Sequence, residues 1–415
     1  MLLSKRFIYS RGQHPDMRLI THVGLILVLL FSIPYSLAQE EAELRKQRLI
    51  WVGEVTGYND MFIDMIPNDP RFELISVVPC TLTILPYDQA VRFVRIYLPR
   101  KYSALKESTD GMLFHDYSPK VMTTKYLEWF RQGVEDGIGL CLVEFAQRIS
   151  ACGMEYWQDT TLYDAFPADL YHNCVEAVDG RQYYRIVQNG PIVDFPEIEK
   201  RIINWGHHGD LIPRDGTTVW ARWRGRKTPA LVSREYGEGT VLHYNHGWDT
   251  MPEDMKRHWR YLPDYIFAHL SFITGLPYPD DLELTHEVRA LFAGLSDQTR
   301  MAISVIEFIE KFGANAREFE NKLADMHEDQ LEAEQAYMEG DLQTAADILD
   351  EANEKVTEIS SDMMRAKNRA MFWIFVVEWL AVTATGMITG FVLWTVMVRR
   401  RLYREVQATR LSQRE

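Results

Sequence analysis

The feature that most constrains the fold is an uninterrupted apolar segment close to the C-terminus. Residues 371–398 read MFWIFVVEWLAVTATGMITGFVLWTVMV and contain one ionisable residue, Glu378. At about 1.5 Å per residue, a helix of this length can cross a hydrocarbon core of roughly 30 Å. The segment therefore predicts one transmembrane helix, which divides the chain into a large part before it and a short tail after it.

The residues around this segment predict its orientation. Tryptophans lie towards its ends and arginines follow it at once: Trp373, Trp379, Trp394, Arg399, Arg400, Arg401 and Arg404. Tryptophan favours the membrane interface, and an excess of Arg and Lys marks the cytoplasmic side. Lys367 and Arg369 on the other side weaken this asymmetry without reversing it. We expect a single-pass protein of the cell membrane, with its N-terminal domain outside and residues 399–415 as a basic cytoplasmic tail.

The same segment carries polar and small residues that favour helix association. An ionisable residue such as Glu378 is costly inside a membrane and usually faces a partner. Thr385 and Thr389 lie beside Gly386 and Gly390, whose small-xxx-small spacing permits close approach of a second helix. These residues predict a homo-oligomer or a membrane partner. The alternative is that Glu378, about two turns from the outer end, reaches out to the interface.

The N-terminal region predicts export. Residues 17–39 read MRLITHVGLILVLLFSIPYSLAQ, with a basic start, a short apolar run and small residues up to Ala38. This pattern is typical of a signal peptide, so we expect residues 1–38 to be a signal segment, with the true start at Met17 and cleavage after Ala38. The alternative is a permanent N-terminal anchor. Cleavage would independently place everything before residue 371 outside the cytoplasm.

Charge and cysteine content limit the partners and the chemistry. The net charge of −14 argues against nucleic acid, since phosphate binding needs a basic face. Cys80, Cys141, Cys152 and Cys174 fall in the exported part, where disulfides persist. Cys152 with Cys174 is the preferred pair, and buried free thiols are the alternative. We identify no metal motif and no cofactor motif.

Apolar runs and helical patterns alternate in the first half of the chain. Strands are expected at residues 48–55, 72–79, 111–117 and 138–145, where hydrophobicity is continuous between Gly, Asn, Asp and Pro. A helical pattern at 123–137 lies between the last two, and this strand-helix-strand order is typical of a parallel α/β unit. A hairpin is expected around Gly237, followed by a helix that stops at Gly275. The predicted domain covers residues 46–281.

Residues 282–370 have a different composition. Proline is absent and Glu, Lys, Ala, Leu and Met dominate, which predicts a helical stalk. Two helices with a turn at Gly340 and Asp341 resemble a single tetratricopeptide-type hairpin. One hairpin is too little for a repeat array, so a spacer or an oligomerisation element is expected. The alternative is a solvated helical pair with no partner.

Four stretches carry a family resemblance. They are GMLFHDYSP, YLEWFRQGVEDGIGLCLVEF, DTTLYDAFPADLY and PALVSREYGEGTVLHYNHGWD. With them, residues 48–279 resemble the class I glutamine amidotransferase-like superfamily, in particular its ThuA-like and related branches. The resemblance implies a flavodoxin-like parallel sheet with helices on both faces.

The chain departs from this family at the catalytic positions. Its amidotransferases use a Cys nucleophile at a sharp strand-to-helix turn, activated by a His and an acid. Here the nucleophile position holds Glu144, and Cys141 lies three residues earlier, in mid-strand, where we expect it to be packed. His246 stands where the family's His would lie, Trp248 occupies the acid position, and Asp249 is the nearest carboxylate. The resemblance therefore implies an incomplete triad.

Polar residues at the predicted strand ends are the candidate site. Ligands of open parallel sheets bind outside the carboxyl ends of the strands. The ligand-binding candidates there are Glu54, His115, Asp116, Glu144 and His246. Two expectations remain: a binding module for a small polar ligand, envelope component or protein, or a ThuA-like hydrolase or carbohydrate-modifying enzyme that uses His246, Asp249 and Glu144. Each residue taken alone is otherwise a solvated edge residue.

A second polar cluster, NWGHHGD, covers residues 204–210. It contains His207, His208 and Asp210 in what reads as a loop. Adjacent side chains point apart on extended backbone, so two ligands for one metal would need a bent loop. We expect surface residues here and no metal site.

Overall fold

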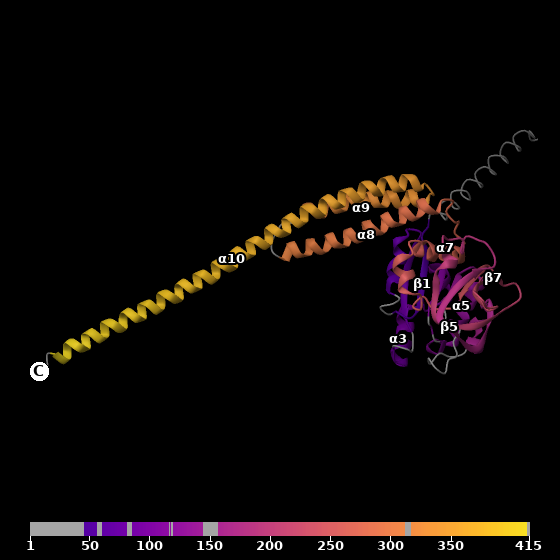
Figure 1. Ribbon diagram of the computed structural model, residues 1–415, viewed down its shortest axis with the longest axis horizontal. Coiled ribbons are helices and arrows are strands. Elements are labelled where there is room, and N and C mark those ends of the chain that lie inside the picture. Colours follow the sequence, from indigo (N-terminus) through magenta and orange to yellow (C-terminus); the bar gives the residue numbers. More distant parts are fainter. Residues whose placement is uncertain are drawn as a thin grey trace, which may run out of the picture. The chain divides into compact units, whose positions relative to one another are not determined.

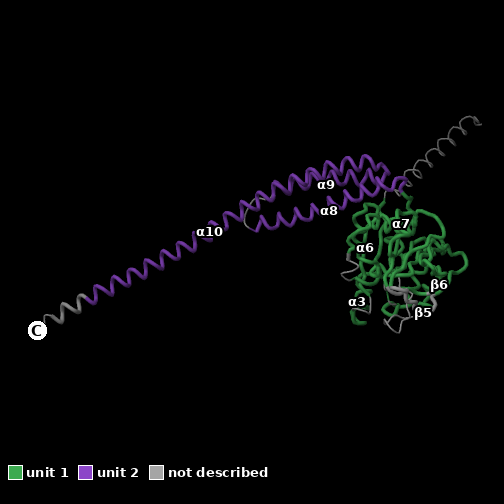
Figure 2. The backbone as a smooth tube through the Cα atoms, viewed as in Figure 1, with its two compact units in different colours: residues 1–278 green, residues 279–415 purple. Residues whose placement is uncertain are grey.

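The computed structural model describes residues 45–55, 60–80, 85–115, 117, 119–143, 157–311 and 317–412, without the side chains of 60, 170–179, 206, 207, 210 and 405–412. It divides into two compact units, Met1–Tyr278 and Pro279–Glu415 (Figure 2). The predicted signal segment, Asp116, Glu144 and Cys152 lie outside the described residues, as does the side chain of Cys174.

The first unit is built on one sheet of nine strands (Figure 1). The strands are β1 (Gln47–Gly53), β2 (Phe72–Pro79), β3 (Gly111–His115), β4 (Gly139–Val143), β5 (Ala168–Ile186), β6 (Ile202–Pro213), β7 (Thr218–Trp223), β8 (Pro229–Tyr236) and β9 (Gly239–Tyr244). Their order is β2-β1-β3-β4-β9-β8-β7-β5-β6. From β2 to β9 neighbouring strands are parallel, and from β9 to β6 they are antiparallel. The predicted α/β class with a largely parallel sheet is confirmed, and the antiparallel extension by β5, β6 and β7 was not expected.

The parallel strands are buried on both faces, which explains their continuous hydrophobic runs. Alternate residues of β1, β3 and β4 share one core with α3 (Tyr87–Tyr97), α4 (Tyr102–Ser108) and α5 (Thr124–Glu135). On the other face α7 (Leu262–Thr274) packs against β3, β4 and β9. The expected helix before Gly275 is therefore confirmed. It begins only at Leu262, because the chain first forms α6 (Glu253–His258) and Pro263 then occupies the first turn of α7.

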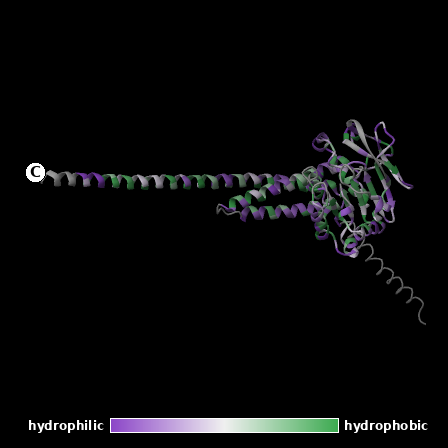
Figure 3. Ribbon diagram, turned by 90° about the horizontal axis from the view of Figure 1, so that it is seen from below, coloured by the Kyte–Doolittle hydropathy of each residue, from purple (hydrophilic) through white to green (hydrophobic). Residues whose placement is uncertain are grey.

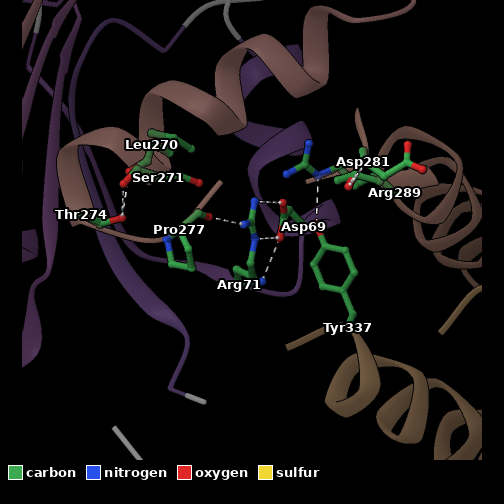
Figure 4. Close-up of polar contacts among 10 residues, drawn as sticks. Asp69, Arg71, Leu270, Ser271, Thr274, Pro277, Asp281, Arg289 and Tyr337 are labelled. Carbon is green, nitrogen blue, oxygen red and sulfur yellow. Dashed lines mark hydrogen bonds and ion pairs between the residues drawn. The ribbon is translucent and has the colours of Figure 1, made fainter. Parts of the chain in front are cut away.

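A buried ion pair between Asp69 and Arg71 lies beside the C-terminal end of this unit. Asp69 follows α2 (Asp60–Met65) and η1 (Ile66–Asn68), and its carboxylate is fully buried. Arg71 meets it with two nitrogens, Nη2 at 3.0 Å and Nε at 3.2 Å. Its Nη1 donates to the carbonyl of Pro277 at 3.5 Å (Figure 4). The pair thus joins the start of β2 to the segment that follows α7.

The second unit consists of α8 (Leu282–Lys311), α9 (Arg317–Met338) and α10 (Leu342–Ser412). The predicted turn between two helices is confirmed at Gly340, whose φ of +84° suits glycine. Residues of all three helices share one hydrophobic core, and Arg289 of α8 donates to the hydroxyl of Tyr337 on α9 at 3.0 Å (Figure 4). The alternative of a solvated pair is therefore wrong, because α8 supplies the missing packing surface.

The C-terminal part of α10 carries the apolar segment. The helix is long and apolar enough to cross a membrane, and hydrophobic residues recur along this part of it (Figure 3). The side chains of its most apolar window are not buried. Arg399, Arg400 and Arg401 form a hydrophilic stretch immediately after it.

Candidate functional site

The topology brings most of the described site candidates to one edge. Strands β1, β3, β4 and β9 are neighbours and parallel, so their carboxyl ends meet there. Glu54 follows β1, His115 ends β3, and His246 and Asp249 follow β9. Asp116 and Glu144 were expected at the same edge and lie outside the described residues.

His115 is a neutral, fully buried imidazole at this edge. Its Nε2 accepts a hydrogen bond from the backbone N–H of Trp248 at 3.1 Å and lies 3.9 Å from Oδ1 of Asp249. Because Nε2 accepts, the proton is assigned to Nδ1. The ring stacks on Trp51 with 5.6 Å between ring centroids. Burial lowers the pKa of His115 to about 3, and the nearby His246 and Lys256 act in the same direction.

Asp249 is the described carboxyl at this edge whose pKa is shifted. Burial raises its pKa to about 6, and the charge of Glu54 adds to this, while Lys256 opposes it. Its side chain keeps 30% exposure, so the proton can exchange with solvent. Lys256 Nζ donates to the backbone carbonyl of Asp249 at 2.9 Å. A Cβ at Gly247 would lie 2.1 Å from the Asp249 carboxylate, so a larger residue at position 247 would displace this carboxylate.

His246 is enclosed by hydrogen bonds within the fold. Its Nδ1 lies 2.9 Å from the carbonyl of Gly247, which can only accept, so Nδ1 carries the proton. Nε2 then accepts from the Tyr184 hydroxyl at 3.0 Å, and that hydroxyl lies 3.3 Å from the Tyr265 hydroxyl. Burial lowers the pKa of His246 to about 4. Both ring nitrogens are therefore used.

Cys141 does not lie at the edge formed by the carboxyl ends of the parallel strands. It lies in the middle of β4, is fully buried and is free of any disulfide. Burial raises its pKa far above the ordinary thiol range, so the thiolate is disfavoured. The expectation of a packed thiol is confirmed.

The cluster at 204–210 differs from its expected form. It belongs to β6, which pairs with β5, and His208 is fully buried rather than on the surface. The ring of His208 lies 5.4 Å from that of Trp223, and its Nδ1 lies 2.7 Å from the carbonyl of Gly209. The side chains of His207 and Asp210 are outside the description. Among the described residues no group of three or more His, Cys, Asp and Glu side chains could hold a metal ion.

Two further buried histidines were missed in the sequence. His243 in β9 is fully buried against Phe166, at 6.0 Å between rings. His269 on α7 is also buried, and its Nδ1 lies 2.7 Å from the Tyr244 hydroxyl. Burial lowers the pKa of each to about 3. Each stands inside an apolar run, VLHYN and FAHLSF, and that position was the available signal for burial.

A depression lies beyond the carboxyl end of β3. Its volume is about 300 Å³, and it is formed by η2 (Pro119–Val121), the start of α5 and the turn at 159–160. Lys120 and Asp159 place opposite charges in its lining. The lining of the depression therefore contains both a cation and a carboxylate.

No protein-family model and no curated protein matches the chain. Among solved structures it is similar to two cytoplasmic proteins of Salmonella typhimurium. The first has 16% identity and a TM-score of 0.43 over 54% of this chain and 98% of that protein; the second has 15% and 0.42 over 55% and 99%. It is also similar to a β-galactosidase of Rahnella sp. R3, with 10% identity and a TM-score of 0.33 over 56% of this chain and 32% of the enzyme. Likenesses this distant say nothing about function.

Proposed function

We propose that the chain is a single-pass membrane protein whose external N-terminal domain binds a small polar ligand, envelope component or protein at the strand edge without catalysis. The state of His246 carries this proposal. It stands where the resemblance puts the catalytic His, yet both of its ring nitrogens are hydrogen-bonded inside the fold. The acceptor nitrogen Nε2 faces a buried tyrosine hydroxyl and not a Cys or Ser nucleophile, burial lowers the pKa of His246 to about 4, and the Cys141 thiol is buried in mid-strand, which together argue against a working Cys-His pair.

The strand order supports a degenerate glutamine amidotransferase-like domain. Across the sheet the parallel strands lie in the order β2-β1-β3-β4-β9, which corresponds to the 2-1-3-4-5 order of flavodoxin-like sheets when the five are numbered along the chain. In such sheets the ligand binds at the point where the strand order reverses, here between β1 and β3. Glu54 and His115 stand at the ends of these two strands. The binding site of the proposal is therefore the edge formed by Glu54, His115 and Asp249.

The apolar part of α10 supports the membrane anchor. Its arginine-rich continuation favours a cytoplasmic C-terminus. The hydroxyls of Thr385 and Thr389 donate to the carbonyls of Ala381 and Thr385 in their own helix, both at 2.8 Å. Their donors are thus used, so Glu378 and the Gly386 and Gly390 pair carry the proposed association with a second helix.

The test is ligand-dependent stabilisation of the full-length chain in nanodiscs, screened with amino acids, monosaccharides and cell-wall muropeptides. A ligand of the strand edge should raise the melting temperature of the wild type and of Cys141→Ser equally. The double variant Glu54→Gln with Asp249→Asn should lose this shift. A shift that survives the double variant places the ligand elsewhere and contradicts the proposed site.

One observation favours the alternative, a ThuA-like hydrolase or carbohydrate-modifying enzyme. Asp249, with a pKa of about 6 beside Glu54, can hold or release a proton near neutral pH, as a general acid must. Such an enzyme would hydrolyse aryl glycosides with a pH-rate limb near 6, abolished by Asp249→Asn. Absence of turnover from pH 5 to pH 8 would remove this alternative.

A further inference from the structure

One surface segment of the first unit is basic, although the chain as a whole is acidic. Between Tyr87 and Lys101 there are four basic residues and one acidic residue, Asp88, in a chain with a net charge of −14. The basic residues are Arg92, Arg95, Arg100 and Lys101. All four are exposed, and none forms an ion pair with a residue that the structure describes. Elsewhere in this unit, arginines such as Arg131 are paired.

The geometry of α3 turns this charge outward. Ala90 and Val94 are its buried residues and belong to the core shared with the sheet. Arg92, Arg95 and Ile96 are three and four residues apart, so they lie together on the opposite side. Arg100 and Lys101 continue the charge in the turn before α4.

Large apolar side chains are exposed beside these cations: Ile96 lies on the same side of α3, and Tyr87 and Tyr97 are the first and last residues of the helix. The exposed fractions are 57% for Tyr87, 56% for Ile96 and 47% for Tyr97. Exposed apolar groups gathered in this way mark interaction surfaces. The partner must therefore offer negative charge and an apolar layer together.

A lipid surface has this chemistry. Guanidinium groups bind phosphate oxygens in pairs, tyrosine favours the headgroup region, and helices with a basic and an apolar side lie in that interface. An acidic protein surface with apolar groups has the same chemistry, so the anchoring of the chain decides between the two. The proposed membrane helix also holds the chain at a lipid surface, which raises the effective lipid concentration. We propose that the outward side of α3, with Arg100 and Lys101, docks on the phosphate headgroups of an anionic lipid bilayer.

The test is hydroxyl-radical footprinting of the full-length chain in nanodiscs. Discs of phosphatidylcholine alone are compared with discs that also contain phosphatidylglycerol. Oxidation of Tyr87 and Tyr97 should fall several-fold only in the anionic discs, and 1 M salt, with a screening length of about 3 Å, should restore it. Trp205 of β6, 52% exposed at the opposite edge of the sheet order, is the internal control and should keep its rate.

Charge reversal separates docking from a general shielding effect. Arg92→Glu with Arg95→Glu should abolish the protection. The matched reversal Lys227→Glu with Arg185→Glu, at exposed positions outside this segment that likewise form no ion pair with a described residue, should keep it. Equal oxidation in both kinds of disc, or protection that survives the α3 reversal, would overturn the proposal. Protection found only in intact cells would assign the surface to a protein and also overturn it. Co-elution of the chain with the discs reports separately on the membrane helix.

Discussion

Acidification should unfold the first unit, because four of its histidines are buried without charge. His115, His243 and His269 have a pKa of about 3 and His246 of about 4, against 6.5 for free histidine. In the unfolded chain each imidazole meets water and is protonated below pH 6.5. The unfolded state therefore binds more protons than the fold between about pH 4 and 6.5, and the free energy of unfolding falls as pH falls.

The magnitude follows from these pKa values. From pH 7 to pH 5 each such histidine is expected to cost about 1.9 kcal/mol of stability, so the four together cost about 8 kcal/mol. Asp249 acts in the opposite direction. Because its pKa is raised in the folded state, the folded chain binds this proton at a higher pH than the unfolded chain does, which adds about 1.3 kcal/mol to the free energy of unfolding between pH 7 and pH 5. The net loss of about 6 kcal/mol is as large as the whole stability of many domains.

The assay is guanidinium unfolding of the full-length chain in detergent micelles at several pH values, followed by near-ultraviolet circular dichroism. His243→Leu removes one buried imidazole that has no hydrogen-bond partner among the described residues, so it should reduce the loss between pH 7 and pH 5 by about 1.9 kcal/mol. His258→Gln, at an exposed position on α6, is the control and should leave the loss unchanged. An unchanged pH dependence in His243→Leu would refute the reasoning.

Three other changes have defined outcomes. Arg71→Met leaves the buried carboxylate of Asp69 without its bidentate partner and should lower the free energy of unfolding by about 3–5 kcal/mol in the same assay; a loss below 1 kcal/mol would contradict the pairing. Protease added outside intact cells should degrade the chain to a short C-terminal fragment, and an intact chain beside a cleaved control ectodomain would contradict the topology. Glu378→Leu, and separately Gly386→Ile with Gly390→Ile, should each weaken association of the proposed membrane helix by on the order of 1 kcal/mol in a transmembrane association assay, whereas unchanged association in both would indicate a simple anchor.

The parallel half of the fold was predictable from local patterns. Strands β1, β3 and β4 read as continuous apolar runs because both of their faces are covered. The hairpin of β8 and β9 was visible at Gly237, whose φ of +65° fits a tight turn. The antiparallel β5 and β6 were not predictable in this way, because polar residues and glycines interrupt their apolar pattern. The same interruption by polar residues and glycines led us to expect a loop at residues 204–210.

The position of the candidate residues at one sheet edge was predictable, but their chemical state was not. The rule for parallel strands was enough to expect Glu54, His115 and His246 at one edge. The state of His246 depends on Tyr184, which is 62 residues away in the sequence and reaches it only through the folded sheet. The raised pKa of Asp249 likewise needs the burial that tertiary packing provides. Periodicity carries no information about such contacts.

The most direct test of a binding domain without catalysis is glutamine turnover. Full-length chain in nanodiscs is incubated with L-glutamine at pH 7 and the released glutamate is measured. The occupied His246 and the buried Cys141 predict no release above that of empty discs. Glutamate release that disappears in Cys141→Ser or His246→Gln would contradict the account.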